Sequence, residues 1–423
     1  MRTAARSFDR FRRFLKGLGL GRLARMTGFA RRRERKVSPP ALAWAAILGA
    51  ASGPTRGVTD IATAAGAYTG TPVSRQAVHQ RLASAGAVAF FAAVCLALGR
   101  RLAGGGVPSL PGKLGTFADI VAVDSTVVGL LDRLARAFPA CRTNSRKAAL
   151  KIHARLSLTR KDAERLRITS ERTPDLHGTA FGAWVRDRLV LFDLGYFDYG
   201  LFAAIRRQGG TFLTRLKTTA NGVILAVRDG CAARAVGTPL NQRIYTGRVV
   251  DLDAQLGRGA TTVVARVVGI WDATAADYHW YVTSLAAADF SPDEVATLYG
   301  LRWQVELLFK EWKSVCHLTS LRTADPHLVQ VLIYASLAFA LLARLALAFA
   351  CQRYGLEWHA MSQFRALKTL GVYAFALGER LVRRRRRGGS AALRLAFERL
   401  LETTAVYAPL PNRTNAILQA AGC

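Results

Sequence analysis

The feature that most constrains the fold is a series of short β-type runs that begins near Phe117. Residues 120–128 are rich in valine, and residues 150–158 alternate apolar and polar side chains with the period of two that half-buried strands show. Further strands are expected at 165–173, 189–192, 211–217 and 278–285, and helices at 180–186, 198–207 and from Pro292 onward. With the stretch from 218 to 285 left out, the order is β-β-β-α-β-α-β-α, which predicts an α/β domain with a mixed sheet.

Residues 218–279 interrupt this order with short β-type runs separated by glycines, and we expect them to form a separate β-rich insertion. The chain on both sides of the core has mainly helical patterns. The expected parts are an N-terminal basic helical region (1–110), the first and second halves of the core (111–217 and 280–351), the insertion (218–279) and a C-terminal helical region (352–423).

The net charge points to a polyanionic partner. Sixty Lys and Arg residues against 28 Asp and Glu give +32, which self-repels in the free protein and favours nucleic acid or an anionic membrane. A ribosomal or histone-like binder seldom carries 51% apolar residues over 423 positions. The apolar run 328–351 is long enough to cross a bilayer, but a buried helix of a large domain has the same pattern. We expect no membrane association and a helix buried against the sheet, in which Arg344 needs an acid, a carbonyl or solvent at one edge.

The six cysteines form no C-x-x-C pair, and no His cluster completes a zinc site. No apolar segment followed by a small-residue cleavage site marks a signal peptide near the N-terminus. We therefore expect reduced cysteines in a cytoplasmic protein.

Two N-terminal segments have patterns that fit DNA contact. Residues 1–36 place Phe8, Phe11 and Phe14 among many Arg and Lys, which fits either a solvated arm or a helix lying on phosphates. Residues 58–92 resemble a helix-turn-helix, in which Ser74 would cap a polar recognition helix, although an ordinary helical pair fits equally well.

The strongest motif lies on the helix that begins at Ser291 and Pro292. At about 100° per residue, its polar side chains fall within an arc of roughly 80°, beside an apolar face. These polar residues are Tyr299, Arg302, Glu306, Lys310 and Lys313. The simpler interpretation is a solvated helix with an Arg302–Glu306 ion pair. It is weakened by two acids that precede the helix in the core: Asp124 on the first strand and Asp193 at the end of the fourth.

The spacing Tyr299-x₂-Arg302-x₃-Glu306-x₆-Lys313 resembles the signature of the insertion-sequence-four group of transposases. The segments around Asp124 and Asp193 are similar to that group's two earlier acid motifs, and the resemblance covers about 117–325. It implies an RNase H-like catalytic domain and a DDE transposase with Asp124, Asp193 and Glu306 as catalytic, metal-binding residues.

The resemblance also implies partners and cofactors. Two Mg²⁺ or Mn²⁺ ions per site would be held by the three acids, since hard cations prefer carboxylates. Double-stranded DNA, as terminal inverted repeats and target, would be bound by a homodimer on paired ends, with 1–110 binding DNA and 352–423 as the possible dimer surface. The DNA-contacting residues would be Tyr299, Arg302, Trp303, Lys310 and Lys313. We expect the protein to associate with the nucleoid.

Other interpretations stay open at this point. Another RNase H-like nuclease, such as a junction resolvase, would use similar acids, and a catalytically inactive DNA-binding descendant would keep the fold. Asp198 competes with Asp193 for the second acid position, although its place before a helix suggests an N-cap. The basic run 383–387 fits either a solvated loop or a phosphate contact.

Overall fold

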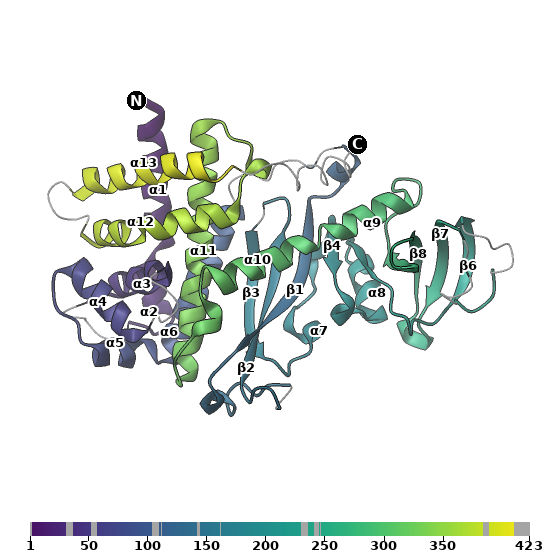
Figure 1. Cartoon of the computed structure of the whole chain (residues 1–423), viewed down its shortest axis with the longest axis horizontal. Coiled ribbons are helices and arrows are strands. Elements are labelled where there is room, and N and C mark those ends of the chain that lie inside the picture. Colours follow the sequence, from purple (N-terminus) through teal and green to yellow (C-terminus); the bar gives the residue numbers. More distant parts are fainter. Residues whose placement is uncertain are drawn as a thin grey trace.

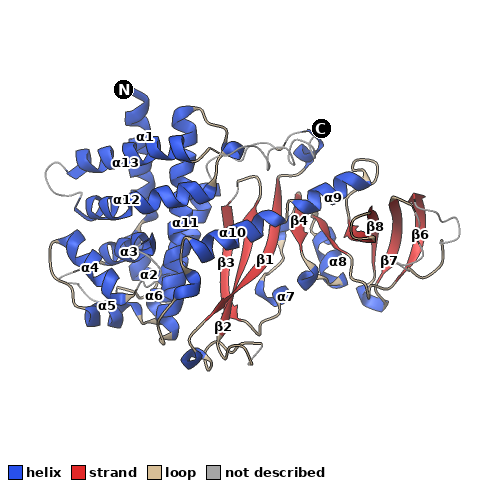
Figure 2. Cartoon of the chain, in the orientation of Figure 1, coloured by secondary structure: helices blue, strands red, loops and turns tan. Residues whose placement is uncertain are grey.

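A computed structural model gives the arrangement of the chain (Figures 1 and 2). It describes residues 2–30, 37–51, 57–103, 110, 112–141, 144–160, 162–229, 236–240, 245, 247–383 and 389–409. The basic residues 384–387 lie outside these ranges. A helical body occupies one side of the molecule, and the sheet extends away from it to the other side (Figure 2).

The part of the chain that the structure describes contains thirteen α-helices and nine strands. The helices are α1 (Arg2–Leu18), α2 (Leu20–Met26), α3 (Pro39–Leu48), α4 (Val58–Thr69), α5 (Arg75–Leu82), α6 (Ala85–Ala103), α7 (Asp175–Gly178), α8 (Tyr199–Arg207), α9 (Pro292–Gly300), α10 (Trp303–Ser314), α11 (Pro326–Tyr354), α12 (Gln363–Arg383) and α13 (Gly389–Tyr407). The strands are β1 (Asp119–Gly129), β2 (Ala149–Ser157), β3 (Asp162–Ser170), β4 (Arg188–Phe192), β5 (Thr211–Arg215), β6 (Gly222–Asp229), β7 (Val249–Leu256), β8 (Val263–Asp272) and β9 (Asp277–Thr283).

The strands form one mixed sheet in the order β3-β2-β1-β4-β5-β9-β8-β7-β6. Strands β1, β2 and β3 pair antiparallel, whereas β4 and β5 continue the sheet parallel to β1. Strand β1 is apolar on both faces because Ile120 and Ala122 enter one core cluster and Val121 and Val123 enter the other. The expected α/β class is confirmed, with a mixed sheet whose strands are preceded and followed along the chain by helical regions.

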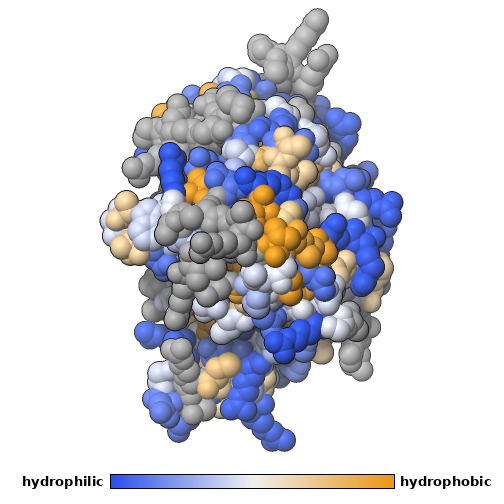
Figure 3. Space-filling model, turned by 90° about the vertical axis from the view of Figure 1, so that its right-hand side faces the viewer, coloured by the Kyte–Doolittle hydropathy of each residue, from blue (hydrophilic) through white to orange (hydrophobic). Residues whose placement is uncertain are grey.

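The β-rich insertion extends this sheet instead of forming a separate unit, which corrects the sequence expectation. Strand β9 pairs with β5 through Leu213↔Thr283, and β8, β7 and β6 follow outward. Val250 and Trp280 share a core cluster with Phe192 of β4. Figure 3 views the molecule from the end that carries these strands, where polar side chains surround an apolar patch. The exposed apolar side chains of β6 and β8 include Val223, Leu225 and Val264.

The expected long helix from Pro292 is two helices, α9 and α10, with a tight turn between them. Its start is as expected, because Ser291 Oγ accepts from the Glu294 N–H and the Glu294 carboxylate accepts from the Ser291 N–H. At Leu301 and Arg302 the backbone bonds run three residues back instead of four, which tightens the coil locally. The turn therefore ends α9 just before the acid-bearing segment.

Helix α11 contains the apolar run 328–351, and its neighbours are mainly the helices α6, α12 and α13, with little of the sheet. We expected this helix to be buried against the sheet, so its location is corrected. By length and composition, α11 and the segment 85–102 of α6 could each cross a membrane, yet 89% of the α11 window is buried inside the protein, as for a core helix. Arg344 meets its expected need for an acid by donating to Glu311 of α10 at 3.1 Å.

The N-terminal helix α1 is not the solvated arm that was one of the two interpretations of the sequence. Its side chains Phe8 and Phe11 are buried, and the Phe11 ring stacks on Phe397 of α13 at 4.1 Å. Basic residues such as Arg12 and Arg13 stay exposed on the other face. The phenylalanines thus dock this helix onto the helical body and leave its charge in solvent.

Helices α4 and α5 follow the helix-turn-helix pattern in outline. Gly70 ends α4 in the left-handed region at φ 73°, and Ser74 Oγ caps α5 by accepting from the Ala77 N–H. Arg75 and Gln76 are exposed on α5, but Arg81 turns inward and donates to the Val37 carbonyl. Gln80 in the last turn is also exposed, so the supposed recognition face is open apart from the half-buried His79 and Arg81.

The buried pair between Arg344 and Glu311 generates a stability prediction. Their side chains are only 6% and 12% exposed, so Glu311→Ala would remove the acid that forms an ion pair with a buried arginine. We expect a loss of about 3 kcal/mol in the free energy of unfolding, measured by urea denaturation. The control Glu398→Ala removes a helical pair whose partners are 27% and 40% exposed, and it should cost less than about 1 kcal/mol. Equal losses in both variants would contradict this account.

Candidate active site

The three acids singled out by the sequence open onto one cavity of about 610 Å³. Asp124 comes from β1, Asp193 follows β4, and Glu306 lies in the first turn of α10. The cavity is lined by Asp124, Ser125, Thr126, Asp193, Arg302, Glu306, Phe309, Lys310, Lys313 and Ser314. Three distant segments thus deliver carboxylates to one place, with basic side chains on the same walls.

The pairing of β1 with β4 brings the two aspartates together. These strands are parallel, and Val123 is the register partner of Phe192. The next residue in each strand direction is an aspartate, so Asp124 and Asp193 start from neighbouring strands about 4.8 Å apart. Asp193 also accepts a hydrogen bond from the Gly195 N–H at 2.9 Å, which fixes its turn after the strand.

Glu306 reaches the cavity because α10 has a strongly apolar back. Val305, Leu308 and Trp312 are buried in the core cluster that also contains Ala122 of β1. Burial of this face holds the helix against the sheet and leaves Glu306 and Lys310 on the opposite side. The helix therefore carries its acid on a rigid element.

Arg302 joins two of the three acids. One guanidinium nitrogen donates to Asp124 Oδ2 at 3.1 Å, and another donates to Glu306. The ion pair with Glu306 is the i,i+4 contact that the simpler helix interpretation expected, but the same side chain also bridges to the sheet. Arg302 also contacts Tyr299, because its guanidinium carbon lies 5.7 Å from the centroid of the Tyr299 ring.

Burial governs the ionisation of the aspartates. Burial, and next the charge of Asp193, raises the pKa of Asp124 to about 7, against the lowering effects of the Ser125 N–H and Arg302. The pKa of Asp193 is also raised, mainly by burial and further by Asp175 and Glu306. The site therefore gathers more negative charge than one guanidinium neutralises, which favours an additional cation.

The donor set fits hard divalent cations, since carboxylates are their preferred protein ligands. In the present side-chain arrangement, however, no three described His, Cys, Asp or Glu side chains stand close enough together to hold a metal ion. Arg302 lies between Asp124 and Glu306 and accounts for part of that separation. Asp124, Asp193 and Glu306 are the residues that would hold such ions, after a movement of the Arg302 side chain.

The structure brings some of the expected DNA-contacting residues to the cavity and leaves others beside it. Arg302, Lys310 and Lys313 line the cavity, and burial, then Arg146, lowers the pKa of Lys313. Tyr299 does not line it, because its ring packs against Tyr281 at 5.3 Å. Trp303 also lies outside the lining and is 57% exposed.

Asp175 is a site residue that the sequence analysis missed. Its Oδ1 accepts from Ser125 Oγ at 2.6 Å and lies 3.1 Å from Lys151 Nζ, directly behind the cavity residue Ser125. No recognisable motif surrounds Asp175, and its contacts with Ser125, Lys151 and His153 come from strands 22 or more positions away in the chain. Asp198, the competitor of Asp193, caps α8 by accepting from the Leu201 N–H at 2.7 Å, as expected of an N-cap.

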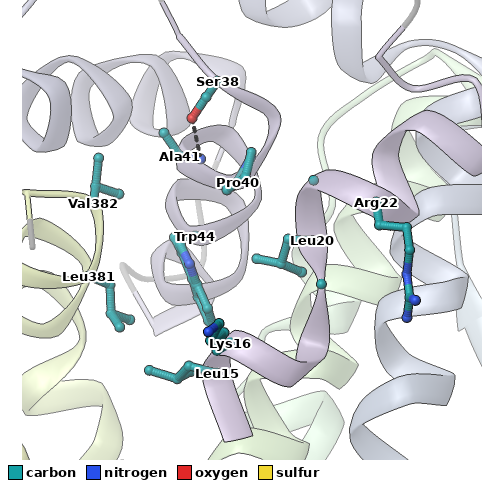
Figure 4. Close-up of a pocket in the computed structure, with 12 residues that line it drawn as sticks. Leu15, Lys16, Leu20, Arg22, Ser38, Pro40, Ala41, Trp44, Leu381 and Val382 are labelled. Atoms are coloured by element: carbon teal, nitrogen blue, oxygen red, sulfur yellow. Dashed lines mark hydrogen bonds between the residues drawn. The ribbon is translucent and has the colours of Figure 1, made fainter. Parts of the chain in front are cut away.

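A second cavity of about 450 Å³ lies within the helical body, among α1, α2, α3 and α12 (Figure 4). Leu20, Trp44 and Leu381 lie along it, whereas the Arg22 side chain points away from its centre (Figure 4). None of the described residues that line this cavity carries a carboxylate. It lacks the converging polar groups of a catalytic site.

The segment that matches a known protein family contains all three acids of the cavity. Residues 115–342 match the family model described as the transposase DDE domain, which spans β1, β4 and the Glu306 helix. The chain belongs to the DDE transposase domain family. Its match begins just before β1 and ends within α11, so it includes all three acids.

Two relatives from Escherichia coli are described as transposases of insertion sequence elements. The putative transposase InsL for insertion sequence element IS186A, from strain K12, is 43% identical over 135 residues, which is 31% of this chain and 36% of the relative. The transposase for insertion sequence element IS421 gives the same figures. The chain thus spans about a third of the length of the curated relatives it matches. A solved structure of a piggyBac transposase synaptic complex with hairpin DNA is similar with a TM-score of 0.49 and 12% identity, over 92% of this chain and 81% of that one.

The Arg302 bridge generates a prediction for the DDE domain without DNA. Arg302→Gln removes the positive charge that neutralises Asp124 and Glu306, so the free energy of unfolding should fall by about 1–3 kcal/mol. Adding Asp124→Asn to that variant relieves the repulsion and should recover most of the loss. Thermal unfolding in the presence of EDTA measures both. A loss that persists unchanged in the double variant would show that Arg302 acts through packing instead of charge.

Proposed function

We propose that this chain is an insertion-sequence transposase that binds the terminal inverted repeats of its element and catalyses metal-dependent DNA cleavage and strand transfer. The observation that carries the proposal is the convergence of Asp124, Asp193 and Glu306 on one cavity with basic walls. A catalytically inactive descendant would have no reason to keep Asp124 and Asp193 at a place where burial raises the pKa of both carboxyl groups.

The chemistry needs an activated oxygen nucleophile and a stabilised leaving oxygen. When bound, two divalent ions, Mg²⁺ or Mn²⁺, would supply both at the three carboxylates. In cleavage, a water oxygen forms a bond to phosphorus, the bond to the 3′-oxygen breaks, and a 3′-hydroxyl is released. In strand transfer, that hydroxyl attacks a target phosphate, so that one phosphodiester bond forms as another breaks.

The basic residues around the acids would position the DNA. Lys310 and Lys313 lie on the cavity walls, where they suit the phosphates next to the cleaved bond. Arg302 would pass from Asp124 and Glu306 to a phosphate oxygen, because guanidinium binds both acceptors with the same geometry. Tyr299 would hold Arg302 through the contact between its ring and the guanidinium, and the exposed Trp303 would stack on an extruded base.

The flanking regions would bind more DNA and a second subunit. The exposed basic face of α1 and the start of α5 suit phosphate contacts in region 1–110. Helices α12 and α13, in region 352–423, expose apolar side chains that suit a dimer surface. These are Val372, Phe375, Leu395, Val406 and Tyr407. The proposed assembly is a cytoplasmic, nucleoid-associated homodimer on paired ends, in which the two membrane-length helices serve as helices of the protein body.

The acids should be separable from DNA binding by mutation. Asp124→Ala, Asp193→Ala and Glu306→Ala should each lower cleavage of end DNA by at least a thousandfold, because each removes a ligand of the metal site. End binding should change little, measured by a mobility shift with EDTA. The control is Asp198→Asn, which keeps the α8 cap and should keep cleavage. Cleavage within tenfold of wild type in one of the alanine variants would remove that residue from the catalytic set.

Assembly should depend on DNA. With +32 on each chain, free subunits repel until phosphates neutralise them, so we expect monomers in solution and dimers on paired ends, measured by light scattering. Val372 is 81% exposed, and Val372→Glu should prevent the DNA-bound dimer. Val264→Glu, a matched change on β8, should leave it intact. A tight dimer without DNA at low salt, insensitive to Val372→Glu, would refute both the trigger and the surface.

A further inference from the structure

A second basic site lies on the opposite face of the sheet from the acid cavity. It is a pocket of about 290 Å³ on strands β2 and β3, closed on one side by the segment 178–180. Leu166 and Ile168 of β3 pack into the helical core, so their neighbours Arg165 and Arg167 point to the other face. The lining residues are His153, Ala154, Arg155, Arg165, Arg167, Gly178, Thr179 and Ala180.

The pocket concentrates positive charge that the fold does not neutralise. Arg155 and Arg165 are direct register partners across β2 and β3, a like-charge pairing that destabilises an antiparallel sheet. Glu164 is the acid beside them, and it is shared among the guanidiniums of Arg155, Arg160 and Arg188. Among the described residues, no acid forms an ion pair with Arg165 or Arg167. The arrangement lowers stability unless an anion is bound.

The walls of the pocket are fixed before any anion arrives. The Arg155 guanidinium lies 4.1 Å from the Trp184 ring centroid, and Arg167 donates to the His177 carbonyl at 3.0 Å. His153 forms the floor and is only 2% exposed, and burial lowers its pKa to about 4, so the ring is neutral near pH 7. A side chain at Gly178 would begin 2.0 Å from the His153 ring, so only glycine allows the loop to approach this closely.

Unlike Arg155 and Arg167, Arg165 is available to bind a ligand in the pocket. It is exposed at the mouth of the pocket, and no hydrogen bond or ion pair holds it to another described residue. Two held guanidiniums with a third free beside them suit a tetrahedral anion with several acceptor oxygens, because each guanidinium offers a planar pair of donors.

We propose that this pocket binds a backbone phosphate of a DNA segment that runs along β3, outside the acid cavity. The proposal rests on the proposed function, since DNA is the phosphate-bearing partner of a transposase. Asp124 follows Ala122 on the face of β1 that carries the α10 core cluster, whereas His153 and Arg155 alternate with Ile152 and Ala154 of that cluster and point to the other face. The two sites therefore lie on opposite faces of β1 to β3, about two strand spacings or 10 Å apart along the sheet. The bound segment is DNA beyond the cleaved phosphate, and the contact is independent of base sequence.

The test uses the full chain and a duplex of arbitrary sequence in EDTA, so that no cleavage occurs. Arg165→Gln should weaken binding several-fold and lower the slope of log affinity against log salt by about one, the value for one lost phosphate contact. Arg165→Lys should retain most of the affinity. The matched control is Arg207→Gln, which removes an equally exposed guanidinium from α8, outside the pocket, and should leave the slope unchanged.

Each remaining outcome would overturn either the proposed function, the site or its DNA occupant. Wild-type protein that fails to bind duplex DNA would overturn the proposed function together with this site. Normal binding by wild type and by both Arg165→Gln and Arg167→Gln would overturn the site alone. A further arm titrates inorganic phosphate in thermal unfolding. Stabilisation by phosphate that Arg165→Gln abolishes, with DNA binding unchanged, would assign the pocket to a free anion and overturn the DNA occupant.

Discussion

The parallel pairing of β1 and β4 is the constraint on which the site depends. The partners Val123 and Phe192 are both fully buried, and the residues that follow them are aspartates. Apolar strands hold the two carboxylates closer than they would stay in water, and burial raises the pKa of both. The free energy of apolar burial in the sheet thus maintains an electrostatically unfavourable pair, which a proton or a nearby cation relieves.

Arg302 supplies that relief within the chain itself, and the turn between α9 and α10 gives it the reach. A continuous helix would carry Tyr299 and Glu306 on a single arc. The tightened coil at Leu301 and Arg302 instead lets the guanidinium span from Glu306 to Asp124 while Tyr299 packs on Tyr281. The same positive charge that stabilises the acids is suited to phosphate, so protein and substrate acceptors compete for one side chain.

The sequence predicted what depends on local pattern. Strands β1, β2 and β4, the capping box at Ser291, and the Asp198 cap all follow from neighbouring residues, and the structure has them close to the expected places. Features that depend on distant contacts were missed. The insertion joins the sheet through seven register pairs of β8 with β9, and Asp175 meets Ser125 across 50 positions. Neither contact leaves a local signal, and the catalytic roles stay predictions.

The helical body is part of the same structural unit as the acid-bearing helix, because α11 contacts both. Arg344 of α11 forms its buried ion pair with Glu311, which is on α10 five residues after Glu306. Phe349, further along α11, meets Phe11 of α1 and Phe397 of α13 with ring centroids 6.1 and 5.6 Å apart. Removing region 1–110 or 352–423 would therefore expose apolar surface on α11. A truncated chain would report on lost packing as well as lost DNA contacts, whereas substitutions of exposed arginines in the full chain report on the contacts alone.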